Sequence, residues 1–397
     1  MQLRQNADGL RPRWYELELL DNRYPALHGL RVLAILSVIQ IHVTWIFTGE
    51  QKMPFDRNVT GISLAIFFGM DLFFILSGFL IGRILIGLAD AGPGPRDWAI
   101  FMTRRWMRTL PLYFLWLVLL LLVAPPALDR PHMAVLYVTF TQNLAWPTPQ
   151  GWFPVTWSLT TEEWFYLLFS AAVLGLAALR VRGAVVIACA AFVVLPLAAR
   201  FLLVPAGAPF DTGVRQIALF RLDAIAYGVL MAWAMSRMPA MLARRRNALF
   251  LLGCFFLFFP PDVLAISGDE ALRDACAPVL LSLTAIGFAL WVPASLDVRI
   301  VSPRLASAVR WLSERSYCLY IIHLSVIEFV WNEATLLHVP VILCTPIALA
   351  LSAGLAELSF RYFESPILRL RPRQQSLTVA GAETAANSIA IPLQPAG

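Results

Sequence analysis

The chain has 397 residues, of which 59% are hydrophobic and 14% are charged. Soluble globular domains are about 45–50% apolar and about 25% charged, so this chain has too little polar surface to cover a soluble core. The composition therefore excludes a soluble globular enzyme, a secreted disulfide-stabilised domain and a disordered protein. A mean hydropathy of +0.70, with several apolar runs of membrane-spanning length, indicates a polytopic membrane protein.

Apolar runs along the chain predict about ten transmembrane helices, and the run at 158–179 is the weakest because Glu162 and Glu163 lie in its first turn. The ten predicted spans are 27–48, 62–82, 106–124, 158–179, 183–204, 214–236, 247–265, 276–294, 316–336 and 339–360. The predicted fold class is all-α integral membrane, with both termini cytoplasmic and no appended soluble domain.

The arginines predict the orientation of these spans in the membrane. With the N-terminus inside, 24 arginines fall in inner segments and six basic residues fall in outer ones. Positive charges concentrate in cytoplasmic loops, so the asymmetry places both termini in the cytoplasm. The same rule accounts for the formal net charge of +6 and gives no reason to expect a nucleic-acid partner.

Three regions follow from the span assignment. Residues 1–26 form a cytoplasmic N-terminal segment, 27–368 a transmembrane domain, and 369–397 a cytoplasmic tail that we expect to be disordered. The longest loops are 84–105 inside and 125–157 outside. The outer loop is rich in proline and tryptophan and is long enough to serve as a lid or an acceptor platform.

Ionisable side chains within the predicted spans point to function, because each costs a few kcal/mol at membrane depth. They are Arg31, His42, Asp71, Glu162, Glu163, Arg221, Asp223 and His323. Arg31 and His42 share one stripe of the first helix, since eleven residues at about 100° each return to nearly the same face, about 16 Å further along. An extended anionic ligand entering from the cytoplasm fits that stripe. The alternative is that His42 is a hydrogen-bonded packing residue.

The second helix combines small and polar residues. Gly69 and Gly78 would allow a neighbouring helix to approach closely, and the hydroxyl of Ser77 can bond to a neighbour. The carboxylate of Asp71 either neutralises an arginine, Arg31 or Arg221, or takes part directly in chemistry. An ion pair is at least as good an interpretation as chemistry.

An arginine cluster, Arg104, Arg105 and Arg108, follows at the cytoplasmic end of the third span. It is either ordinary positive-inside anchoring or a clamp for phosphate groups. In the fourth span, Glu162 and Glu163 point to different faces, so at most one of them can face His42 and fix its tautomer. Their charge at a helix N-terminus is the structural alternative. Arg221, Asp223 and His323 are predicted to form a polar network lining a cavity.

Seven motifs in order resemble the membrane-bound acyltransferase 3 family. They are the Arg31-to-His42 spacing, Gly69–Ile81, Arg104–Arg108 with Pro111, Trp157–Tyr166, Phe220–Ala224, Ser316–His323 and Arg361–Pro366. The resemblance covers roughly residues 24–368. Two positions depart from the family pattern: His28 stands where aspartate is common, and Cys318 where serine is usual. Both lie off the expected chemistry.

The resemblance implies a bacterial cytoplasmic-membrane enzyme that transfers an acyl group, often acetyl, from cytoplasmic acyl-CoA to a hydroxyl of a glycan, a lipid-linked sugar or a small molecule. It implies His42 as general base with Arg31 and Glu162 in the catalytic set, and no metal. Donor binding is expected from Arg104, Arg105, Arg108 and Ser77. The expected substrate pocket comprises Asp71, Trp157, Tyr166, Arg221, Asp223 and His323. The competing hypothesis is a secondary transporter in which the buried histidines and carboxylates relay protons.

Overall fold

The computed structural model describes residues 25–48, 66–124, 132–149, 152–205, 207–296, 298 and 300–372. The predictions for the N-terminal segment up to residue 24, for residues 125–131, 150 and 151 of the outer loop, and for the tail from residue 373 lie outside these ranges. Within them the secondary structure is helical, with no strand. The all-α class is therefore confirmed.

Eleven longer helices and several short ones make up the described chain. The longer ones are α1 (Pro25–Thr48), α3 (Gly69–Ala91), α4 (Pro95–Val123), α6 (Trp157–Ala178), α7 (Ala184–Leu203), α8 (Leu222–Arg237), α9 (Pro239–Ser267), α10 (Glu270–Ser295), α11 (Pro303–Glu314), α12 (Ser316–Leu336) and α13 (Val341–Ser359). The short ones are α5 (His132–Val138), η2 (Pro154–Thr156), η3 (Phe210–Arg215), η4 (Ala218–Phe220), η5 (Phe360–Glu364) and α14 (Ser365–Arg369).

Eight helical segments of the described chain are long and apolar enough to cross a membrane: α1, α3, α4, α7, η4 with α8, α9, α10, and α13 with α14. The protein is therefore a multi-pass membrane protein. Helices α6 and α12 coincide with the predicted spans 158–179 and 316–336, but their polar side chains leave them outside that set of eight. The count of ten spans and the cytoplasmic termini stay predictions.

Two predicted boundaries are wrong around the predicted inner loop 84–105. Helix α3 continues to Ala91 and α4 begins at Pro95, so the predicted inner loop 84–105 is mostly helix. The apolar runs stop at arginines, whereas a helix backbone continues into the polar surface until a residue ends it. That residue is Gly92, whose φ of 78° lies in the left-handed region, and Pro95 starts the next helix.

The predicted span 214–236 is interrupted at its start. A π-helical turn, η3, and a 3-10 turn, η4, precede α8, which begins only at Leu222. The breaks fall where buried polar side chains need backbone partners: the Asn143 amide donates to the carbonyl oxygen of Gln216 at 2.5 Å. Such irregular backbone is tolerated at membrane depth where protein surrounds it.

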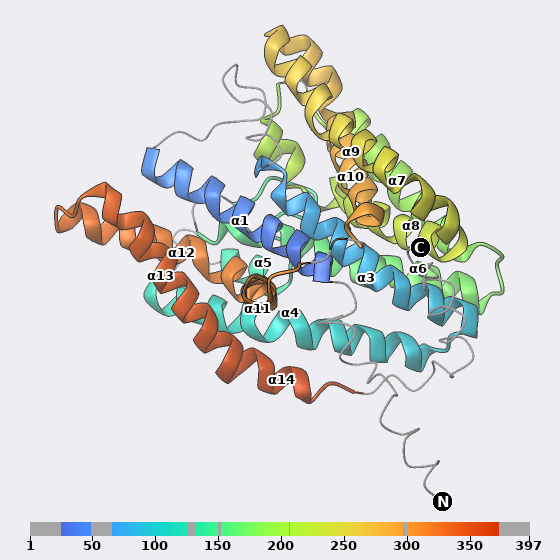
Figure 1. The fold of residues 1–397 in the computed structure, drawn as a ribbon, viewed down its shortest axis with the longest axis horizontal. Coiled ribbons are helices and arrows are strands. Elements are labelled where there is room, and N and C mark those ends of the chain that lie inside the picture. The colour runs from blue at the N-terminus through green and yellow to red at the C-terminus, as the bar shows by residue number, and fades with distance from the viewer. Residues whose placement is uncertain are drawn as a thin grey trace, which may run out of the picture.

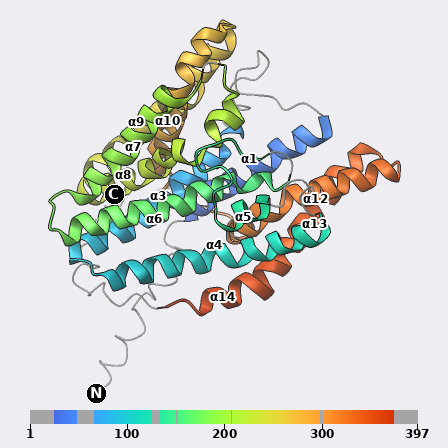
Figure 2. The same ribbon diagram turned by 180° about the vertical axis from the view of Figure 1, so that it is seen from behind.

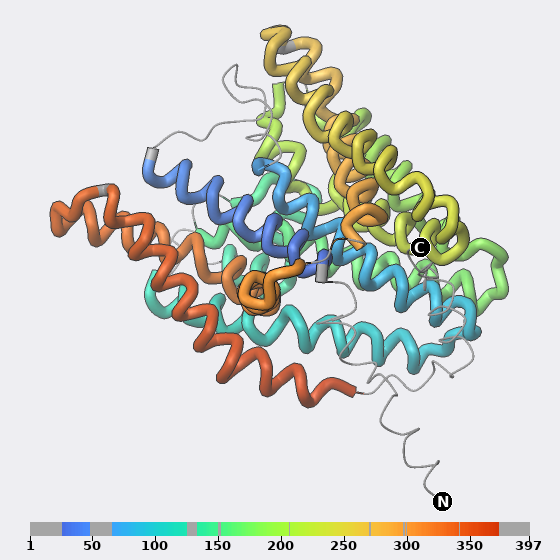
Figure 3. Tube along the Cα trace, in the orientation of Figure 1, coloured from blue at the N-terminus to red at the C-terminus, as the bar shows by residue number. Residues whose placement is uncertain are grey.

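The helices form two neighbouring groups (Figure 1). Helices α7, α8, α9 and α10 pack along one side, with α9 against α10 and α7 against α8. On the other side α1 lies between α3 and α12, and α13 packs along α12; the view from behind shows α4 and α6 covering this group (Figure 2). The chain trace shows α3 passing between the two groups (Figure 3), where it packs most extensively against α8.

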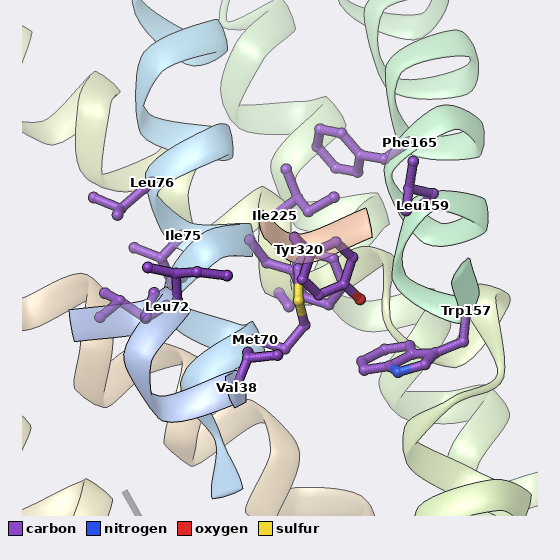
Figure 4. Packing of buried hydrophobic residues seen from close by; sticks show 14 of the residues in the cluster. Val38, Met70, Leu72, Ile75, Leu76, Trp157, Leu159, Phe165, Ile225 and Tyr320 are labelled. Atoms are coloured by element: carbon purple, nitrogen blue, oxygen red, sulfur yellow. The ribbon is translucent and has the colours of Figure 1, made fainter. Parts of the chain in front are cut away.

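Helix α3 carries much of the hydrophobic core. Leu72, Ile75 and Leu76 are nearly or fully buried, and in Figure 4 they lie along α3, with Ile225 of α8 between them and the α6 side chains Trp157, Leu159 and Phe165 in this view. Between α3 and α6 lies Tyr320 of α12, with Met70 next to it (Figure 4). Helices α1, α3, α4, α6 and α12 thus surround the polar groups considered next.

Candidate active site

A cavity of about 90 Å³ lies between these five helices. Its lining combines cations, a carboxylate, hydroxyl groups and aromatic rings. The lining residues are Arg31, Met70, Phe73, Phe74, Leu76, Ser77, Leu80, Arg105, Arg108, Thr109, Ser158, Leu159, Glu162, Tyr166, Ser316, Tyr317 and Tyr320. An enclosed site of this make-up suits an anionic ligand with an apolar portion.

Three guanidinium groups converge on the cavity from two helices. Arg31 of α1 forms no hydrogen bond or ion pair with any residue that the structure describes, although Glu162 and Glu364 attract it over longer distances. Arg105 of α4 is buried and lines the cavity. Arg108 donates from Nη1 to Oε1 of Glu364 at 2.6 Å. Guanidinium groups gathered in this way can bind phosphate or carboxylate.

Arg104, the third arginine of the cluster, has a different environment. Its Nη1 donates to the carbonyl oxygen of Pro372 at 2.6 Å, and it is not among the lining residues. Successive residues of a helix point about 100° apart, so Arg104 and Arg105 cannot face one cavity as Arg105 and Arg108 do. The structure therefore brings Arg105 and Arg108 to the predicted donor site and ties Arg104 to the chain beyond α14.

The carboxylate of Glu162 is bound by two hydroxyl groups inside the cavity. Ser77 donates to Oε1 of Glu162 at 2.6 Å, and the hydroxyl of Tyr166 donates to the same oxygen. Ser77 and Tyr166 also lie 2.7 Å apart. Three residues from two helices, α3 and α6, thus form one polar cluster on the cavity wall.

Glu163 faces another part of the molecule. Its Oε1 accepts a hydrogen bond of 2.5 Å from Thr109 of α4, and the hydroxyl of Tyr317 donates to the backbone oxygen of Thr109 at 2.5 Å. These contacts tie α6, α4 and α12 together. As the sequence predicted for adjacent residues, the two carboxylates point to different faces.

His42 is hydrogen-bonded to a second histidine. Its Nδ1 lies 3.0 Å from Nε2 of His323 on α12, and the ring centroids are 5.0 Å apart. His323 is fully buried, and its Nδ1 lies 2.8 Å from the backbone oxygen of Leu319. The partner of His42 is therefore an imidazole, in place of the carboxylate that the sequence suggested.

Tyr320 lies at the boundary between the cavity and this histidine pair. It lines the cavity, while its ring centroid is 6.1 Å from that of His323. Its hydroxyl is fixed by Ser158 at 2.6 Å and by the backbone oxygen of Val155. His42 is not among the lining residues, so the histidine pair lies outside the cavity, next to this side chain.

The remaining predicted pocket residues lie outside the cavity lining. Asp71 and Arg221 form an ion pair with both side chains fully buried. Asp223 pairs with Arg200 at 2.7 Å, again fully buried. The Arg215 guanidinium stacks 4.8 Å over the Trp157 ring. These contacts hold α3, α7 and α8 together beside the cavity.

Two residues outside the predicted site, Glu364 and Cys318, are linked to Arg108. Glu364 pairs with Arg108 at 2.6 Å. The Cys318 thiol donates to the other oxygen of Glu364 at 2.8 Å. Arg200, assigned to an outer segment, is buried too. Sequence spacing gives no signal for contacts between helices so far apart along the chain.

No group of three or more histidine, cysteine, aspartate or glutamate side chains suited to a metal ion occurs in the described part of the chain. The five cysteines are all unpaired thiols. The polar groups of the cavity are three guanidinium groups, one carboxylate and several hydroxyl groups, and the excess of positive charge suits an organic anion.

A model of the family described as "Acyltransferase domain" matches residues 24–357 of this chain. No solved structure matches the chain. The family match covers every helix from α1 to most of α13, and therefore all of the cavity lining.

Three curated relatives are similar over most of the chain. The "Putative peptidoglycan O-acetyltransferase YrhL" of Bacillus subtilis is 26% identical over 382 residues, covering 87% of this chain and 55% of the relative. "Peptidoglycan O-acetyltransferase OatA" of Listeria monocytogenes is 24% identical, covering 86% and 55%. "O-acetyltransferase OatA" of Staphylococcus aureus is 27% identical, covering 88% and 58%. The chain spans just over half the length of these relatives.

Proposed function

The chain belongs to the acyltransferase 3 family, and from that premise we propose that it is a membrane-embedded O-acyltransferase. It transfers an acyl group, acetyl in the first instance, from cytoplasmic acyl-CoA to a hydroxyl group of a glycan, glycolipid or small molecule. The names of the relatives favour a cell-envelope glycan such as peptidoglycan as the acceptor. The bacterial cytoplasmic membrane is the corresponding location.

The observation that carries this proposal is the cavity lined by Arg31, Arg105 and Arg108. Acyl-CoA is a nucleotide with several phosphate groups and an extended pantetheine arm. Guanidinium groups bind phosphates in a bidentate manner, and an apolar wall of Phe73, Phe74 and Leu80 suits the arm. Arg31 supplies a cation with no other hydrogen-bonding partner in the described chain.

The transfer step needs a base, a site for negative charge and a leaving group. His42 accepts the proton of the acceptor hydroxyl, whose oxygen attacks the thioester carbonyl carbon. The oxyanion that develops needs a hydrogen-bond donor beside His42, whereas Arg31, about 16 Å away along α1, serves to hold the anionic donor. As the tetrahedral intermediate collapses, the C–S bond breaks and the CoA sulfur takes the proton from His42. Products are the ester and free CoA, and His42 returns to its neutral form.

In this scheme Tyr320 and Phe73 control the access of the acyl group to the histidines. Both line the cavity, and their rings lie 6.4 Å apart. The thioester must pass this pair to reach the histidines, so the two rings limit the access of the acyl group. Glu162, held by Ser77 and Tyr166, fixes the cavity wall along which the pantetheine arm lies.

The test uses the purified protein in detergent with labelled acetyl-CoA and an acceptor glycan. We expect donor binding and transfer in the wild type. His42→Ala should keep donor binding but lose transfer by about 10²–10⁴-fold, the usual contribution of a general base. Arg105→Glu should raise KM for the donor more than it alters use of the acceptor.

Arg237→Ala is the matched control, because this arginine pairs with Asp90 at the surface and both side chains are more than half exposed. It should leave KM for the donor unchanged. A wild-type protein that binds no acyl-CoA contradicts the proposed donor, and a His42→Ala variant with normal transfer removes the proposed base. Proton-coupled uptake of a solute, with no acyl transfer, would support the transporter hypothesis.

A further inference from the structure

The histidine pair contains a fixed direction of hydrogen bonding that begins at a backbone group. The oxygen of Leu319 can only accept, so Nδ1 of His323, which lies 2.8 Å away, must carry the hydrogen. A neutral imidazole has one N–H group, and the Nε2 of His323 is therefore a hydrogen-bond acceptor.

The same reasoning applies to the ring of His42. Nε2 of His323 faces Nδ1 of His42 at 3.0 Å. Two acceptors at this distance would repel, so Nδ1 of His42 carries a hydrogen and donates it. In a neutral His42 the remaining nitrogen, Nε2, then has a free electron pair. The direction of donation is thus from His42 to His323 to the backbone of α12.

We propose that His323 is a positioning residue that holds His42 in the tautomer with Nδ1 protonated, which makes Nε2 of His42 the basic nitrogen. This inference rests on the proposed function, in which His42 is the base, and it deepens that proposal by naming the atom that takes the proton. His323 itself exchanges no proton with the substrate.

Burial and packing support this role over that of a second base. His323 is fully buried, whereas His42 is partly exposed. Both nitrogens of His323 are used, one by Leu319 and one by His42. No lone pair of its ring is left for a substrate. The fixed bond to Leu319 also sets the ring plane of His323, which lies at 50° to that of His42.

The arrangement has a consequence for the charged intermediate. When Nε2 of His42 takes a proton, its Nδ1–H group still points at an acceptor, so the imidazolium keeps its hydrogen bond. Orienting groups of this kind are valuable because a base in the wrong tautomer presents N–H to the hydroxyl it should deprotonate. A side chain without an acceptor at position 323 would let His42 populate both tautomers.

The test combines a spectroscopic measurement with two matched variants. The chain has five histidines, so protein labelled with ¹⁵N in histidine alone gives few ring signals, and His42→Ala assigns those of His42. In the wild type at a pH where His42 is neutral, we expect a protonated Nδ1 and an unprotonated Nε2. His323→Leu should abolish this preference and lower kcat by about 10²–10³-fold, with KM for the donor within about threefold of wild type.

His323→Gln should rescue much of the loss, because its amide oxygen can accept from Nδ1 of His42. His28→Gln is the control: His28 lies on the same helix α1 and is hydrogen-bonded to Ser313 at 2.9 Å, so its replacement should change neither the His42 signals nor kcat.

Three results would overturn the inference. They are a wild-type His42 protonated at Nε2, a His323→Leu variant with normal kcat, and a folded glutamine variant no better than the leucine one. The measurement on the wild type needs no activity, so it separates this inference from the proposed function. If His42→Ala keeps full transfer, the proposed base is wrong while the tautomer is still measured directly.

Discussion

At the scale of single residues, the buried ion pair of Asp71 and Arg221 has an incomplete set of partners. Both side chains are fully buried. Oδ2 of Asp71 and the Nε and Nη1 groups of Arg221 have no hydrogen-bond partner within the described chain. Such a pair contributes little net stability, yet removal of one member leaves an uncompensated charge in the interior. This identifies a structural role for Asp71 beside the cavity.

Asp71→Asn should therefore lower stability by about 3–5 kcal/mol, with little change in KM for an acyl donor. The reason is that Arg221 loses its counter-ion, while the cavity lining keeps its charges. Thermal unfolding in detergent measures the loss. The double variant Asp71→Leu with Arg221→Met should be more stable than Asp71→Asn alone. A rise in KM with unchanged stability would instead place Asp71 at the substrate.

The sequence identified these charged residues and offered Arg31 or Arg221 as the partner of Asp71, and the structure shows Arg221. A charged residue within a predicted span can be recognised in a sequence because it interrupts an apolar run. Each such residue is expected to have a partner or a function, since an unpaired charge is costly at membrane depth. Spacing along one helix also predicts which residues share a face, as for Glu162 and Glu163. Which helix faces that surface is a property of packing, so the bond between His42 and His323, 281 positions apart, could not be predicted.

At the scale of helices, the crossing of α3 and α8 depends on two glycines. A methyl group on Gly78 would overlap the backbone oxygen of Ile225, and one on Gly228 would overlap that of Ile75. The two backbones therefore touch directly, as small residues permit between membrane helices. The predicted packing role of Gly78 is confirmed. This crossing places Ser77 at the cavity, one residue from the contact.

Gly78→Ala should destabilise the protein by about 1–3 kcal/mol, because the helices must separate to admit the methyl group. The midpoint of thermal unfolding in detergent checks this. Gly175→Ala in α6 is the control, since nothing lies within 4 Å of a methyl group there, and a helical alanine is favoured over glycine. Equal midpoints for both variants would show that the close contact is absent.

Helix existence could be predicted better than helix ends. All ten apolar runs contain a helix within the described residues, because length and hydropathy are sufficient signals. The observed C-terminal end of α3 and N-terminal end of α4 differ from the predicted ones, because helical turns that contain arginines extend both helices past their apolar runs. The interruption at η4 was missed because Ala218–Phe220 is as apolar as its surroundings, while most of η3, with its polar residues Asp211 and Thr212, precedes the predicted span. The amphipathic helix α11 is too short and too polar to stand out as a span.

For the whole molecule, the unequal distribution of arginines predicts which end of the bundle faces the cytoplasm. Ala91, where α3 ends, belongs to the inner side under that prediction, and Ala145, between α5 and η2, to the outer side. Both residues are exposed. The orientation determines the compartment from which the arginine-lined cavity receives its ligand.

Ala145→Cys should react with a membrane-impermeant maleimide added to intact cells, whereas Ala91→Cys should react only after permeabilisation. The native cysteines are buried or half-buried, and the wild-type protein gives their background. The readout is the mass shift of the labelled chain. Labelling of Ala91→Cys in intact cells would invert the topology and contradict a cytoplasmic donor.

Tyr320 has a consequence for the cell beyond the proposed acyl transfer. A membrane that stores an ion gradient cannot tolerate a permanent aqueous path through one of its proteins. The ring of Tyr320, fixed by Ser158 and the backbone of Val155, borders the polar cavity and the histidine pair at once. A small side chain at position 320 would open a path between the cavity and the histidine pair. The first effect we expect is leakage of protons across the bilayer.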